Sequence, residues 1–292
     1  MSRFFLIFAA LLAFFPDPHA RAFCRMTVEE PMPRDGCPAP GTWLEWRRQC
    51  ISYTLVDRDA DESDFEEVRD AADRSFSRWT AVECDDGPLP IELAQTSDLG
   101  LCTTAEYNQR SGNANTIYFV DNWLELGLPF DAFGLTMIWH SPEDGEIFDA
   151  DMQLNETQGR FTVCDDRCEP GTVDLENVIT HEAGHFLGLG HSEVSDATMH
   201  SRASTGETSK RTLEADDIEG ICHIYGDLDA PDCDVSDFQP DHGFSPECAG
   251  PEGALPAKNG LCSIGAPAPT PGVAGGFLLA LVLVLARRRS KT

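Results

Sequence analysis

Three histidines in residues 181–191 limit the local structure more than any other part of the sequence, because they follow the spacing HExxHxxGxxH. On an α-helix, residues four apart differ by roughly 40° in rotation, so His181 and His185 project from one face and can share a metal ion. Gly188 allows the backbone to leave the helix through a left-handed residue, which brings His191 back as a third ligand. Three imidazoles leave the fourth position of a tetrahedral zinc ion open to water, as in catalytic zinc sites.

Glu182 lies beside the two helical histidines, where its carboxylate can reach a water on the metal more easily than the metal itself. A carboxylate in that position is suited to take a proton from water as a general base. The alternative is a metal-free amphipathic helix, which would place three histidines and a glutamate beside its apolar face for no gain. The motif therefore predicts Zn²⁺ as the cofactor and Glu182 as the catalytic residue.

Both ends of the chain have the composition of processing segments. Residues 1–22 combine a basic residue, an apolar run and a small-residue cleavage site, in the order of a secretory signal peptide. Residues 272–292 combine an uncharged apolar stretch with three arginines, which predicts a short transmembrane or sorting tail. The protein is therefore expected to be secreted or attached to the cell surface, with the tail as its contact with the membrane.

Charge and cysteine content agree with export. The chain has 50 Asp and Glu against 21 Lys and Arg, and this formal charge of −29 excludes a nucleic-acid partner. Of the 11 cysteines, Cys262 lies next to the Pro-rich spacer and is set aside, and the even number of the other ten predicts disulfides whose pairing stays open. Cys164 and Cys168 are close enough to close one small loop.

Apolar periodicity predicts the order of the elements. Strands are expected at residues 51–56, 89–94, 116–120, 134–139 and 147–154. Helices are expected after a capping box of Ser63 and Glu66, from Asp174 to Gly188, and at residues 213–225. In residues 147–154, Asp149 and Asp151 alternate with apolar residues, which predicts an edge strand. These two aspartates are also candidate ligands of a structural Ca²⁺.

The sequence HEAGHFLGLGHS, followed by Met199, resembles the metzincin zinc endopeptidases and among them the matrixin branch. Residues 134–155 resemble the strand pair of that family, and residues 213–226 resemble its last helix. The resemblance implies an α+β fold: a twisted five-stranded mixed sheet, two long helices, and a small C-terminal subdomain with a Met-turn and a final helix. It also implies that Met199 is an apolar support beneath the imidazoles and not a ligand.

The expected organisation has five parts. They are a signal peptide (1–22), a short N-terminal segment (23–40), a matrixin-like catalytic domain (41–226), a Cys/Pro/Gly-rich linker (227–271) and the C-terminal tail (272–292). The family's PRCGxPD-like cysteine switch is not found, because Cys37 in RDGCP matches it poorly.

The resemblance implies an exported, monomeric zinc endopeptidase that acts on extended protein or peptide substrates paired along residues 147–154. Two alternatives stay open: a non-catalytic surface adhesion or scaffold module that keeps the zinc-stabilised fold, and zinc hydrolysis of a non-protein amide. The presence of Glu182 favours catalysis, because a scaffold needs the three ligands but not the base.

Overall fold

The computed structural model describes residues 23–29, 32–56, 64–102, 104–165, 167–253 and 280–286. The predicted signal peptide lies outside these residues. Of the predicted C-terminal tail, only residues 280–286 are described, and they form a strand. None of the helices in the described ranges combines the length and the apolar character that a bilayer crossing requires.

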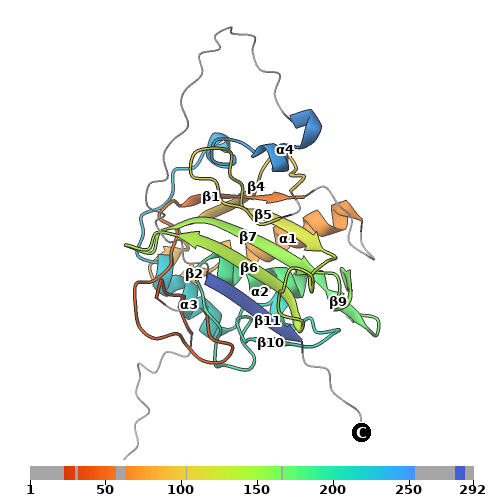
Figure 1. The fold of residues 1–292 in the computed structure, drawn as a ribbon. Coiled ribbons are helices and arrows are strands. Elements are labelled where there is room, and N and C mark those ends of the chain that lie inside the picture. Colours follow the sequence, from red (N-terminus) through yellow and green to blue (C-terminus); the bar gives the residue numbers. More distant parts are fainter. Residues whose placement is uncertain are drawn as a thin grey trace, which may run out of the picture.

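A mixed sheet organises the molecule (Figure 1). Its five central strands are β1 (Cys50–Leu55), β4 (Glu92–Gln95), β5 (Thr116–Val120), β6 (Ala132–His140) and β7 (Ile147–Asn155). They lie in the order β6-β7-β5-β1-β4, and only β6 runs antiparallel to its neighbour. Beyond β6, the sheet continues through β11 (Ala280–Ala286) and β10 (Arg202–Ala203). The predicted α+β fold with a mixed sheet is thus confirmed.

The prediction of an edge strand at residues 147–154 was wrong. β7 pairs with β5 on one side and with β6 on the other, so it is an interior strand. Its alternating aspartates suggested a solvated face, but Asp149 and Asp151 are both fully buried. The segment before β5 covers them and supplies hydrogen-bond donors, and that contact is invisible in the pattern of β7 alone. The outer strands of the five are β6 and β4.

Two helices pack on one face of the sheet, α1 (Phe65–Thr80) and α2 (Leu175–Phe186) (Figure 1). The indole nitrogen of Trp79 in α1 donates to the carbonyl of Thr180 in α2 over 2.9 Å, so the two helices are also joined by a buried hydrogen bond. The capping box of α1 is formed by Asp64 and Glu67, one residue later than predicted, because the Asp64 carboxylate accepts the Glu67 N–H. The predicted start of α2 at Asp174 is confirmed.

Shorter elements and disulfides complete the fold. The remaining elements are β2 (Glu83–Cys84), β3 (Gly87–Pro88), β8 (Arg160–Thr162), β9 (Thr172–Asp174), α3 (Ala215–Tyr225), α4 (Pro246–Gly253) and 3-10 turns at Ser209–Arg211 and Val235–Asp237. The disulfides are Cys24–Cys37, Cys50–Cys233, Cys84–Cys222, Cys102–Cys248 and Cys164–Cys168. Two of them attach the chain after Gly226 to the sheet, so this part of the predicted linker is fixed to the domain.

Candidate metal centre

The three predicted histidine ligands come together in the structure. His181 and His185 lie one turn apart on α2, and His191 follows the turn at Gly188, whose φ is 94°. One ring nitrogen from each of the three lies within 4.8 Å of the others, and the Nε2 atoms of His181 and His185 are 3.0 Å apart. All three side chains are buried.

Hydrogen bonds on the far side of each ring fix its tautomer. The Nδ1 atoms of His181, His185 and His191 lie 2.6, 2.8 and 3.2 Å from the carbonyl oxygens of Thr198, Leu189 and Pro33. A carbonyl only accepts, so each Nδ1 carries the proton and donates it.

The inward nitrogens are then left with lone pairs. Burial holds the pKa values of His181 and His185 well below the usual range, which keeps these rings neutral. Lone pairs that converge at 3.0 Å repel one another unless a cation lies among them, so this donor set suits a zinc ion.

Glu182 is buried beside this cluster. The hydroxyl of Thr136 in β6 donates to its Oε2 over 2.7 Å, while Oε1 has no hydrogen-bond partner among the described residues. Burial raises the pKa of the carboxyl to about 8, against the lowering effect of the Thr136 hydroxyl. A Cβ at Gly134 would lie 2.9 Å from Oε1, so the glycine leaves the room that this oxygen needs. The carboxylate is therefore anchored through one oxygen and open at the other.

Met199 packs beneath α2, as the Met-turn resemblance implies. A Cβ at Gly184 would collide with the Met199 sulfur, so the thioether lies directly against the helix that carries two ligands. Asp217 in α3 accepts the N–H groups of Thr198 and Met199 over 2.7 and 2.9 Å. The buried Lys210 ammonium donates to the carbonyls of Thr198 and His200 over 3.0 and 2.6 Å. The turn is thus held through its own backbone.

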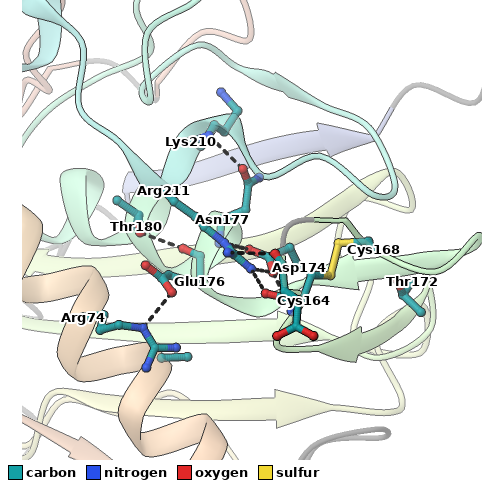
Figure 2. Close-up of polar contacts among 12 residues, drawn as sticks. Arg74, Cys164, Cys168, Thr172, Asp174, Glu176, Asn177, Thr180, Lys210 and Arg211 are labelled. Carbon is teal, nitrogen blue, oxygen red and sulfur yellow. Dashed lines mark hydrogen bonds and ion pairs between the residues drawn. A yellow bond between two sulfur atoms is a disulfide. The ribbon is translucent and has the colours of Figure 1, made fainter.

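The start of α2 is anchored by a second polar network (Figure 2). The Asp174 carboxylate accepts the Asn177 N–H at the helix N-terminus over 2.7 Å, and it also accepts the Cys164 N–H and the Arg211 guanidinium. Two residues on, Glu176 is paired with Arg74 of α1 over 2.8 Å. These contacts fix the helix that presents His181 and His185 in both position and rotation.

The predicted calcium ligands lie elsewhere in the sheet. Asp151 accepts three hydrogen bonds, from the Thr116 N–H, the Thr116 hydroxyl and the Glu106 N–H. Asp149 accepts the Asn113 amide over 2.6 Å, and its Oδ2 has no partner among the described residues. Neither belongs to a described group of three ligand atoms within 4.8 Å. Structural calcium stays a prediction, and Oδ2 of Asp149 is the one oxygen of these two carboxylates that is open to bind it.

Sequence reasoning missed four residues around the site: Thr136, Pro33, Asp217 and Lys210. All four lie at least ten residues from the groups they contact, so no local spacing connects them to the motif. Thr136 and Asp217 lie in the two stretches that resemble the family, residues 134–155 and 213–226, and a closer comparison of those stretches could have identified them.

Three convergent imidazoles and a carboxylate beside them, on an α+β scaffold with a methionine turn beneath, define a metzincin-like single-metal site. The sequence profile of the Matrixin family matches residues 45–226, and the chain belongs to this family.

Several curated proteins are similar over the same region. The chain is 30% identical to Metalloendoproteinase 1-MMP of Arabidopsis thaliana over 187 residues, which cover 62% of this chain and 44% of that protein. It is 28% identical to Stromelysin-2 of Rattus norvegicus (70% and 39% covered) and 27% identical to Neutrophil collagenase of Homo sapiens (66% and 37% covered). The chain thus spans less than half the length of these relatives.

Proposed function

We propose that the protein is an exported zinc endopeptidase that hydrolyses peptide bonds in extended protein segments. The observation that carries this proposal is the open Oε1 of Glu182, buried beside three imidazoles whose ring nitrogens converge. Family membership supports the zinc and the reaction class. A scaffold that used zinc for stability alone would have no use for a buried, half-satisfied carboxylate in this position.

His181, His185 and His191 would hold the metal, which supplies a Lewis acid for the peptide carbonyl and makes the attacking water more acidic. The chain's own chemistry is then the proton transfer by Glu182. Its free Oε1 accepts the proton of the attacking water, while Thr136 holds Oε2 in place. The same carboxyl returns that proton to the amine that leaves. A raised carboxyl pKa suits both steps, because the group must accept and then release a proton near neutral pH.

We further infer that the substrate pairs along β6, and not along residues 147–154 as the sequence suggested. β6 is one of the two outer strands of the five and carries Thr136 and Gly134 next to Glu182, so an extended segment beside β6 would pass the base. β10 follows Met199 and flanks the same path of the substrate beside β6. Residues 199–205 would therefore set which substrate side chains are preferred. Oxidised disulfides support an exported protein. The signal peptide, the membrane contact of the tail and the monomeric state stay predictions.

Proteolysis of casein or gelatin, with and without a chelator, tests the proposal. The purified full chain should cleave, a chelator should abolish cleavage, and added zinc should restore it. Glu182→Ala should lower kcat by roughly 10²–10⁴-fold, with zinc content unchanged. Cleavage that survives Glu182→Ala would overturn the mechanism. Bound zinc without cleavage of either protein would favour the scaffold or a non-protein amide substrate.

A further inference from the structure

The third ligand differs from the other two in the origin of its outer hydrogen-bond partner. His181 and His185 donate to Thr198 and Leu189, which both lie within 17 residues of the ring they hold. His191 donates to Pro33, which lies 158 residues earlier. Pro33 also precedes residues 45–226, the part of the chain that the family shares. A segment outside the region matched by the family profile therefore touches the metal site.

That segment, residues 23–29 and 32–37, is called the N-terminal strap below. It is paired with the turn that leads to His191. The Met26 N–H donates to the Gly188 carbonyl over 3.0 Å, and the Gly190 N–H donates to the Cys24 carbonyl over 2.8 Å. Arg25 and Leu189 form an antiparallel bridge between these bonds. Gly188 and Gly190, on either side of Leu189, are thus hydrogen-bonded to the strap just before His191.

Side-chain packing tightens this contact. A Cβ at Gly190 would collide with the terminal methyl of Met32 and lie 3.2 Å from Cys24 Cβ. The strap therefore lies against the backbone of the turn itself, with room for a glycine only. A displacement of the strap would be passed to the backbone that aims His191.

Three tethers hold the strap in place. The Cys24–Cys37 disulfide closes it into a loop around Pro33. Asp35 forms a two-pronged ion pair with Arg202 of β10, both contacts being 2.9 Å long. On the other side, Arg34 lies 3.6 Å from the carboxylate of Asp131, just before β6. The strap thus connects β10, on one side of the proposed substrate path, with the residue before β6, on the other side.

From these contacts we propose that the N-terminal strap is a positioning element of the metal site, in which the Pro33 carbonyl orients the His191 ring. The inference rests on the zinc site of the proposed function. The strap supplies no ligand and takes no part in the reaction. It completes the set of outer acceptors, of which the others are Leu189, in the turn after α2, and Thr198, in the Met-turn. Loss of such an outer partner lowers metal affinity by roughly 10–100-fold.

The test is a zinc titration of the full chain by chelator competition. Cys24→Ser/Cys37→Ser releases the strap, and Cys102→Ser/Cys248→Ser is the control, because it removes a disulfide whose cysteines belong neither to the strap nor to the contacts that hold α2 and the Met-turn. We expect the zinc Kd to rise roughly 10–100-fold in the first variant and to stay within about twofold in the control. Substitution by Co²⁺ gives a second readout, since its visible absorption should change in the first variant only.

Asp35→Ala is a second strap variant, for the case that the disulfide variant misfolds. It removes an exposed ion pair that holds the strap and leaves every cysteine in place. It should raise the zinc Kd in the same direction by a smaller factor. Equal zinc Kd values and equal Co²⁺ spectra in the wild type, the strap variant and Asp35→Ala would overturn the inference. The titration involves no turnover, so a shifted Kd in a protein that cleaves nothing would contradict the proposed function and still support the strap.

Discussion

Thr136 illustrates how a residue outside the motif can control the base. Its hydroxyl is the one side-chain donor that the described structure gives to Glu182, at 2.7 Å from Oε2. Valine has the same shape without the hydroxyl, so Thr136→Val should leave the zinc Kd unchanged and lower kcat by about 10-fold, as loss of a positioning hydrogen bond does. Because this hydroxyl lowers the pKa of Glu182, the acidic limb of the kcat profile should move to higher pH.

Thr136→Ser is the matched control, since serine keeps the donor and removes only a methyl group. It should retain most of the activity and the wild-type pH profile. A Thr136→Val enzyme with wild-type kcat and an unmoved acidic limb would show that Glu182 needs no partner from β6.

Asp149 allows a prediction about stability and pH. Burial, followed by the charge of Asp151, raises the pKa of Asp149 well above its ordinary value of 3.8. A carboxyl with a raised pKa in the folded state stabilises most below its unfolded value, and stability falls as pH rises through the folded value. Asp149→Asn removes this charge and keeps an acceptor for Asn113. In calcium-free buffer it should stabilise the protein by about 1–3 kcal/mol at pH 8, with less gain at pH 5.

Urea unfolding at the two pH values measures this difference, and the same experiment tests the calcium prediction. If calcium binds at Asp149, the ion should stabilise the wild type at pH 8 and leave the variant unaffected. A variant that is less stable than the wild type at pH 8 without calcium would contradict the interpretation that the buried Asp149 charge, with its one unsatisfied oxygen, destabilises the fold.

Whether a residue of the site could be predicted depends on how far away in the sequence its contact partners lie. His181, Glu182, His185 and His191 were predictable because helical periodicity and one glycine turn place them within eleven residues. Met199 followed from the family resemblance. Thr136 and Pro33 were not predictable from local spacing, since each meets the motif only after the sheet and the strap have folded against α2.

At the scale of elements, α2 is the helix whose placement matters most, and its N-terminus offers a direct comparison with α1. Both helices begin with an aspartate cap, Asp174 and Asp64. The Asp64 cap is exposed, so Asp64→Ala should cost about 1 kcal/mol. The Asp174 carboxylate is buried and also holds Arg211, whose guanidinium would lose its partner (Figure 2). Asp174→Ala should therefore cost about 3 kcal/mol or more.

Urea unfolding of both variants in the presence of zinc gives the comparison. Asp174→Asn separates the two contributions, because asparagine keeps the cap and loses most of the ion pair; its stability should lie between those of the wild type and Asp174→Ala. Equal losses for Asp64→Ala and Asp174→Ala would mean that Arg211 adds nothing to the cap.

The elements were predicted well where a local sequence pattern determines them. They were predicted poorly where their place depends on pairing with other strands. The bounds of β5 and the start of α2 agree with the sequence, because strand alternation and cap chemistry act over a few residues. The position of β7 inside the sheet did not follow from its sequence. Two aspartates in a strand predict solvent exposure unless another segment supplies donors, and here residues 106–116 do so.

For the whole molecule, the largest departure from expectation is the C-terminal strand. β11 pairs antiparallel with β6 and parallel with β10, and Cα atoms of α2 lie within 8 Å of it (Figure 1). Val282 is opposite Thr136, the residue that holds Glu182. β11 therefore takes the place beside β6 that the proposed substrate needs. A tethered segment competes at an effective concentration of the order of millimolar, so β11 should lower the cleavage rate of the full chain without abolishing it.

Val282→Pro should release the segment, because proline removes a backbone donor and is excluded from the interior of a sheet. In a Glu182→Ala background, which prevents self-cleavage, hydrogen exchange of the outward N–H groups of β6 should become faster. In the active protein, the same substitution should raise the rate of peptide cleavage by about 10-fold. A nine-residue apolar edge without lysine or proline is prone to aggregation when uncovered, so the released form should also associate at high concentration. Unchanged exchange along β6 would show that β11 does not cover the edge in solution, whatever the activity.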